Sequence, residues 1–291
     1  MTATLIEGAK IAERLASQTA GLVRDLRAKR RTPMLVALLA GDAKAAASYA
    51  RSQAMRAEKV GIDYRLEQFP ASATTAEIVL AVDRLNCDRS VSGIMFHLPA
   101  PPQIDAAAIQ ERIAAVKDVE GVGAANLGML ALGRDALAPC TAFAAFECIK
   151  FVCPDMTGRR AVVVGRSPIV GKPLAMLLLA ANATVTQCHS KTRDLARHTR
   201  EAEILIAAIG KPGFIRAEHV GRGAIVVDVG TNRVEVADAG GAKKTRTVGD
   251  VFFDDVSPIA SAITPVPGGV GPVTVEALLA NTAAACARSS Y

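Results

Sequence analysis

The sequence predicts an α/β protein with largely parallel sheets and two domains, and three observations support this prediction. Short apolar runs typical of strands alternate with longer segments of helical periodicity along the chain. Hydrophobic residues make up 51% of the 291 positions, enough for two ordinary cores. One stretch, VVVGRSPIVGKPL, has the pattern of a strand, a glycine-bearing turn and a helix start, as in Rossmann-type domains.

The expected elements follow from this alternation in order. A long amphipathic helix over about 8–30 precedes an apolar strand at 34–41. The next helix, at 48–62, contains no Gly or Pro before Gly61, where it should end. The other expected elements are strands at 63–70, 91–99, 160–165, 183–190, 204–210 and 224–230, helices at about 74–86, 105–115, 141–152, 169–181, 192–200 and 272–288, and a surface hairpin within 234–251.

Composition and charge narrow the class of partner. The net charge is +6, but the chain has no Trp and only three Tyr, so we expect a small anionic ligand and no nucleic-acid partner. No apolar run reaches the about 18–20 residues of a membrane span, and the first residues lack the apolar core of a signal peptide. We therefore expect no membrane partner, a cytoplasmic location, six reduced cysteines and no metal site.

The glycine-bearing turn after the strand at 160–165 is a candidate phosphate site. Gly165 permits a tight turn, Ser167 is the second small residue, and Gly171 permits close packing of the helix on the strand. Free N–H groups at such a helix start favour a pyrophosphate. The spacing G-x-S-x-x-x-G is not the strict dinucleotide fingerprint, so the strand and helix around it carry much of this interpretation.

The end of the next strand indicates which dinucleotide binds. An NAD site should place a carboxylate there for the ribose 2′-hydroxyl, whereas this chain has Ser190, Lys191 and Arg193, with Arg166 beside the turn. These donors suit a 2′-phosphate, so we expect NADP. The alternative is that Lys191 and Arg193 only decorate a loop.

The helix at 48–62 is a candidate active-site wall. Tyr49 and Gln53 are four residues apart, so they share a face and can point at one ligand. An amine at the second position would complete an active site, but the Gln53 amide cannot take up a proton.

The motifs together resemble the FolD family of methylenetetrahydrofolate dehydrogenase/cyclohydrolases. The similarity spans essentially the whole chain, and TPVPGGVGP is its most specific stretch. The other matching stretches are SGIMFHLPAP, KDVEG, LAPCT, VVVGRSPIVGKPLAMLLLAANATVTQCHSKTRDL, AAIGKPGF, VVDVGTNR and GDV.

This resemblance implies a homodimer whose chains act on a reduced folate with NADP as cofactor. It places a catalytic folate domain at 1–140, a Rossmann NADP domain at 141–270, and a C-terminal helix, 271–291, that packs back on the first domain, with folate in the cleft between them. Leu98–Pro99 and Val266–Pro267 match cis prolines of the family. The implied folate contacts are Tyr49, Leu98, Pro99, Glu120, Pro267, Gly268 and Gly269, and the implied NADP contacts are Gly165, Arg166, Ser167, Ile169, Val170, Ser190, Lys191, Arg193, Gly210, Gly230 and Thr231.

The chain departs from the family pattern at the implied catalytic positions, which are Tyr49, Gln53, His97 and Glu120. The family's lysine, four residues after the tyrosine, is Gln53 here. The glutamine of its V-Q-L-P motif is His97, and the second aspartate of its K-D-V-D-G motif is Glu120. These changes lie on the folate side, while the NADP motifs stay close to the family pattern.

The chemistry indicates which activity should suffer. Hydride transfer from the methylene carbon needs alignment, whereas hydrolysis of the methenyl group needs a shuttled proton, which an amide cannot carry. We therefore expect a dehydrogenase with lost or weak cyclohydrolase activity. The open alternatives are a bifunctional enzyme that uses His97, a dehydrogenase for a different one-carbon carrier, and an NADP-binding pseudoenzyme. Arg56, one turn beyond Gln53, could restore only the lysine's charge.

Overall fold

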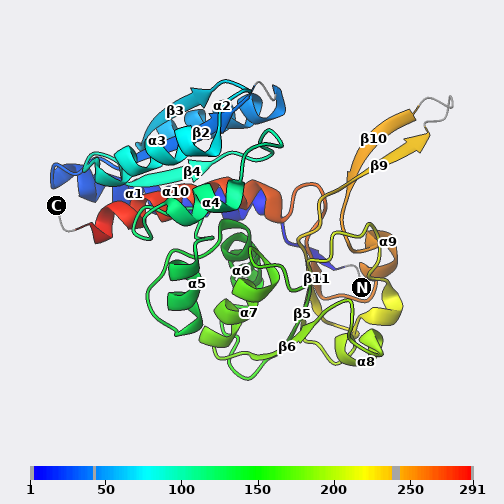
Figure 1. The fold of residues 1–291 in the computed structure, drawn as a ribbon. Coiled ribbons are helices and arrows are strands. Elements are labelled where there is room, and N and C mark those ends of the chain that lie inside the picture. Colours follow the sequence, from blue (N-terminus) through cyan, green and yellow to red (C-terminus); the bar gives the residue numbers. More distant parts are fainter. Residues whose placement is uncertain (1–2, 42–43, 238–242, 290–291) are drawn as a thin grey trace. The chain divides into compact units, whose positions relative to one another are not determined.

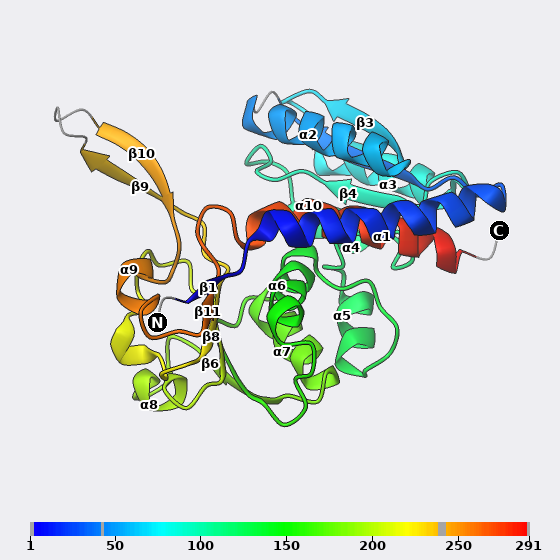
Figure 2. The ribbon, with the colours of Figure 1, turned by 180° about the vertical axis from the view of Figure 1, so that it is seen from behind.

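The computed structural model describes residues 3–41, 44–237 and 243–289 and contains two compact units. The cofactor unit comprises Met1–Ala12 and Thr141–Thr274, and the catalytic unit comprises Glu13–Cys140 and Val275–Tyr291. Figures 1 and 2 show the course of the chain from two sides. Val275–Tyr291 group with the catalytic unit, whereas Met1–Ala12 group with the cofactor unit.

The catalytic unit is built on a three-stranded parallel sheet in the order β3-β2-β4. Successive residues of β2 face opposite sides: Leu35 packs in one core cluster and Val36 in another. The first cluster includes side chains of α1, α2 and α10, and the second those of α3 and α4. The elements are α1 (Gly8–Ala28), β2 (Met34–Ala40), α2 (Lys44–Val60), β3 (Asp63–Phe69), α3 (Thr75–Cys87), β4 (Gly93–Phe96), α4 (Ala106–Arg112), α5 (Ala124–Ala131) and α10 (Val270–Arg288).

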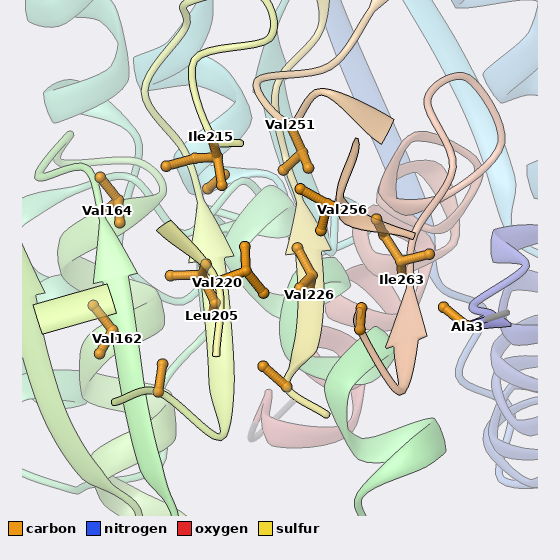
Figure 3. Close-up of a cluster of buried hydrophobic side chains, with 14 of the residues drawn as sticks. Ala3, Val162, Val164, Leu205, Ile215, Val220, Val226, Val251, Val256 and Ile263 are labelled. Carbon is orange, nitrogen blue, oxygen red and sulfur yellow. The ribbon is translucent and has the colours of Figure 1, made fainter. Parts of the chain in front are cut away.

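The cofactor unit is built on a six-stranded parallel sheet in the order β1-β11-β8-β7-β5-β6. Figure 3 shows Val162, Leu205, Val226 and Ile263 of neighbouring strands in its core. The elements are β1 (Thr4–Leu5), α6 (Cys140–Val152), β5 (Arg160–Val164), α7 (Gly171–Ala180), β6 (Thr184–Cys188), α8 (Leu195–Thr199), β7 (Ile204–Ala207), η1 (Ala217–His219), β8 (Ile225–Asp228), β9 (Asn232–Ala237), β10 (Lys243–Val248), α9 (Phe253–Val256) and β11 (Ala262–Ile263).

The two-domain α/β prediction is confirmed, with local differences. Residues 1–12 join the cofactor unit because β1 pairs with β11. The helix expected from 192 begins only at Leu195, because Asp194 adopts a left-handed conformation (φ 46°) and caps it. The predicted hairpin is present as the antiparallel pair β9–β10, and its turn at 238–242 lies outside the described residues.

One helix, α10, is long and apolar enough to cross a membrane by length and composition. In this structure 67% of its 18-residue apolar window is buried, with Leu278 and Leu279 in the core of the catalytic unit. A helix in the core of a protein needs an apolar composition as much as a membrane-spanning helix does, and α10 has the burial of a core helix.

Candidate active site

The turn after β5 has the geometry expected of a phosphate loop. Gly165 has φ 136°, and a Cβ at this position would lie 2.1 Å from the Ala208 carbonyl oxygen. A Cβ at Gly171 would lie 2.2 Å from the Gly165 carbonyl oxygen, so glycine lets α7 approach the turn. The Ser167 hydroxyl accepts hydrogen bonds from the N–H groups of Val170 (3.2 Å) and Gly171 (3.3 Å), which fixes the start of α7.

The end of β6 lies beside this turn because β5 and β6 are adjacent parallel strands. The Gly165 N–H donates to the Cys188 carbonyl (2.9 Å). His189 shapes the following loop, since its Nδ1 accepts the Lys191 N–H at 3.1 Å. Ser190, Lys191 and Arg193 are exposed at this edge. The structure thus brings the residues predicted for a 2′-phosphate to the same sheet edge as the predicted pyrophosphate turn.

The turns after β7 and β8 carry three further predicted cofactor residues. Gly210 lies after β7 with φ 70°, and Gly230 and Thr231 follow β8. The wholly buried Asp250 carboxylate accepts the Gly210 N–H at 2.9 Å. Motif reasoning did not identify Asp250 as a site residue, although it lies in the GDV motif.

A second buried carboxylate, Asp228, lies at the end of β8. It accepts the N–H groups of Gly230 (2.9 Å), Asp250 (2.9 Å) and Val251 (2.8 Å). Burial raises the pKa of Asp228 to about 6 although these three hydrogen bonds lower it, and the Asp250 charge adds to the rise.

A cavity of about 380 Å³ lies in the cofactor unit around the loop that precedes α10. Val266–Pro267 is cis, as is Leu98–Pro99 in the catalytic unit, which confirms the expectation for both bonds. The predicted contact residues that line this cavity are Gly230, Thr231, Pro267, Gly268 and Gly269.

In the catalytic unit Gln53 is completely buried on α2. Its Oε1 accepts the Tyr64 hydroxyl at 3.4 Å, and its Nε2 has no hydrogen-bond partner among the described residues. The backbone of Tyr49 lies one turn earlier on the same helix, but its side chain lies outside the described part of the structure. The position that the resemblance gives to a lysine therefore holds a buried group that does not titrate.

Neither Arg56, on the next turn of α2, nor the buried Lys117 replaces that lysine. Arg56 Nη1 lies 2.7 Å from Glu276 Oε1, and the Glu276 side chain is only 6% exposed, so its carboxylate compensates the Arg56 charge. Lys117 is buried, and its Nζ donates to the carbonyls of Leu85 (2.8 Å) and Asp88 (2.6 Å) at the end of α3. Burial lowers the pKa of Lys117, but its hydrogen bonds give it a helix-capping role.

Glu120 and His97 are the titratable groups of the implied catalytic set. Glu120 Oε2 accepts the Phe96 N–H at 3.1 Å. Burial raises the pKa of Glu120 to about 7, the Phe96 N–H opposes this rise, and the Asp118 charge adds to it. His97 is 3% exposed, and burial lowers its pKa, so its imidazole is neutral at pH 7. Glu120 can therefore exchange a proton near neutral pH, which Gln53 cannot.

The loop that carries Glu120 is held by Asp118. The Asp118 carboxylate accepts the N–H groups of Gly121 (3.0 Å) and Gly123 (2.8 Å) and the Asn126 side-chain amide (3.1 Å). Residues 124–131 then form α5. Within the described ranges, no group of three or more His, Cys, Asp or Glu side chains is placed to hold a metal ion.

Titration of Glu120 should appear in the pH dependence of stability. Because its pKa is about 7 in the folded chain and about 4.3 in an unfolded one, the folded state holds the extra proton between these values. Its contribution is complete below about pH 4.3 and is lost as the pH rises through 7. In Glu120→Gln, we expect a smaller fall of Tm across this window, measured by calorimetry. Parallel curves for the two proteins would contradict the raised pKa.

Comparison with known proteins matches both parts of the chain to one family. Residues 6–120 match the catalytic domain of tetrahydrofolate dehydrogenase/cyclohydrolase, and residues 139–290 match its NAD(P)-binding domain. The chain is 43% identical over 289 residues to the bifunctional protein FolD of Bacillus velezensis, covering 99% of each. Among solved structures, the bifunctional FolD of Campylobacter jejuni has a TM-score of 0.89 at 38% identity, with 98% of each chain covered. The FolD of Trypanosoma brucei, complexed with NADP and an inhibitor, has a TM-score of 0.88 at 37% identity, covering 99% of this chain and 98% of that one.

Proposed function

The chain belongs to the tetrahydrofolate dehydrogenase/cyclohydrolase family, and from this we propose that it is an NADP-dependent 5,10-methylenetetrahydrofolate dehydrogenase with little or no cyclohydrolase activity. The observation that supports low cyclohydrolase activity is the identity of residue 53, which is Gln53. A buried amide that does not titrate occupies the position that the resemblance gives to a catalytic lysine, and the neighbouring cation on α2, Arg56, is paired with Glu276.

The cofactor residues fit a dinucleotide. A Cβ at Gly165 or Gly171 would collide with backbone atoms, so the turn after β5 is shaped to need glycine, as in phosphate loops. When bound, NADP accepts the hydride that leaves the methylene carbon. The residues that hold it under this proposal are Gly165, Arg166, Ser167, Ile169, Val170, Ser190, Lys191, Arg193, Gly210, Gly230 and Thr231.

Folate contacts are assigned in each unit by itself, as the resemblance implies. In the catalytic unit we assign Tyr49 to stacking on the pterin, Glu120 to its polar edge, and Leu98 and Pro99 to its wall. In the cofactor unit we assign Pro267, Gly268 and Gly269. We also propose a homodimer, as the resemblance implies, and a cytoplasmic location.

Two enzyme activities must be measured separately to test this proposal. One assay follows NADPH formation from methylenetetrahydrofolate and NADP, and the other follows loss of supplied methenyltetrahydrofolate above its spontaneous rate. Oxidation without hydrolysis supports the proposal. Both activities at comparable rates would make the chain bifunctional, and neither would favour another one-carbon carrier or a pseudoenzyme.

His97 is the residue that would carry the bifunctional alternative, because it is a titratable side chain of the implied catalytic set, although burial lowers its pKa and so weakens it as a base. If His97 carries residual hydrolysis, His97→Asn should lower it by about 10²- to 10⁴-fold, the usual contribution of a general acid–base. The dehydrogenase rate of the same preparation serves as the control. Residual hydrolysis that survives in His97→Asn would exclude this role.

A further inference from the structure

We propose that Asp250 is a positioning residue of the cofactor site, whose buried carboxylate holds together the backbone of the two turns that bind NADP. These turns follow β7 and β8. The inference rests on the proposed function, which assigns Gly210 in the first turn and Gly230 and Thr231 in the second to NADP.

The two oxygens of Asp250 accept four hydrogen bonds. Oδ2 accepts the N–H groups of Ile209 (2.6 Å) and Gly210 (2.9 Å). Oδ1 accepts the N–H of Lys211 (2.9 Å) and the Asn232 side-chain amide (2.8 Å), which joins the start of β9 to the same carboxylate. Three successive N–H groups of one turn thus converge on one side chain. Among the described residues no Lys or Arg side chain pairs with it, so its role is to orient backbone.

Asp250 is itself fixed to the sheet. Asp228, the last residue of β8, accepts the N–H groups of Asp250 (2.9 Å) and Val251 (2.8 Å). Val251 packs in the core cluster with Ile215 and Val226 (Figure 3). The position of β8 is therefore transmitted through Asp228 and Asp250 to the turn after β7.

Two glycines show how closely the carboxylates approach the turns. A Cβ at Gly230 would lie 2.3 Å from Asp250 Oδ1, and a Cβ at Gly249 would lie 1.8 Å from Asp228 Oδ2. A side chain at Gly230 would therefore displace Asp250 from the turn it organises. This contact links a predicted NADP residue directly to the proposed positioning residue.

The test compares three variants for NADP binding and for steady-state kinetics. Asp250→Asn keeps the size of the side chain but faces an amide N–H₂ toward backbone N–H groups. We expect the Kd and KM for NADP to rise by about 10- to 100-fold, because charged acceptors of buried N–H groups typically contribute such a factor. The kcat at saturating NADP and the KM for folate should change little. Asn232→Ala, which removes only one of the four donors, should give a smaller change of the same kind.

Asp255→Asn is the matched control. Asp255 accepts the Ala217 N–H at 2.8 Å in the same unit, and among the described residues its carboxylate has no hydrogen bond to either turn. Its NADP affinity should equal that of the unmodified protein. Unchanged NADP affinity in a folded Asp250→Asn variant would overturn the inference. A fall in kcat together with equal rises in the KM values for NADP and folate would also overturn it. If Asp250→Asn does not fold, Asn232→Ala decides by the same criteria. Absence of NADP binding to the unmodified protein would instead refute the proposed function.

Discussion

Replacing Gln53 by lysine is expected to raise the hydrolysis of methenyltetrahydrofolate by about 10²- to 10⁴-fold, the usual contribution of a general acid–base. Gln53 lies on α2, a regular helix, so the substitution changes the side chain without a demand on the backbone. The dehydrogenase rate should change much less, because hydride transfer depends on alignment of the substrate. Both rates are measured on one preparation.

The buried Glu276 should limit this gain. One of its oxygens binds Arg56, one turn along α2 from Gln53, and the other has no partner among the described residues. A new ammonium group in this region would be held protonated by a buried carboxylate, which favours the charged form of lysine. We therefore expect hydrolysis to be faster in the double variant Gln53→Lys with Glu276→Gln than in Gln53→Lys alone.

Gln53→Met is the matched control, because methionine has similar length and carries no proton. It should leave both activities near those of the unmodified protein. Gln53→Lys and the double variant could both fold and keep dehydrogenase activity without hydrolysing methenyltetrahydrofolate faster. That result would show that the missing lysine does not limit hydrolysis.

Local features of both units could be predicted because they depend on neighbours in sequence. Gly165 and Gly171 are needed where a strand turns directly into a helix, and the structure shows both close approaches. Gly61 was expected to end the second helix, and it does so with φ 83°. A left-handed residue after a helical segment is a local signal, so periodicity and glycine sufficed.

Features that depend on distant segments could not be predicted in this way. Strand β1 has two residues and exists because it pairs with β11, more than two hundred residues away. Helix α5 was not predicted. Its Asn126 amide donates to Asp118, and the Asn126 Oδ1 accepts the Leu137 N–H. Side-chain contacts of this range leave no periodic pattern.

In the catalytic unit, too, a contact between distant segments at the proposed site could not be predicted from the sequence. The sequence places Gln53 and Arg56 on neighbouring turns of one helix, which the structure contains. That Arg56 pairs with Glu276 on α10 follows only from tertiary packing, since 220 residues separate them. The charge of Arg56, considered as a substitute for the missing lysine, is compensated for this reason.

Removing the two cations at the end of β6, in Lys191→Ala with Arg193→Ala, is expected to weaken NADP binding by about 10- to 100-fold, because charge-assisted contacts to a phosphate are lost. Affinity for NAD, which lacks the 2′-phosphate, should change little. Both side chains are exposed beside the Gly165 turn, so they are accessible to the ligand. The KM values for NADP and NAD are measured with methylenetetrahydrofolate at saturation.

Salt dependence separates a specific contact from a general loss of positive charge. Arg222→Ala removes an exposed cation just before β8, at the opposite edge of the same parallel sheet. It should leave the preference for NADP intact at every salt concentration. Raising the ionic strength should weaken NADP binding of the unmodified protein more than that of the double variant, because exposed charges are screened. Equal losses for NADP and NAD in the double variant would mean that Lys191 and Arg193 support the loop and do not bind the 2′-phosphate.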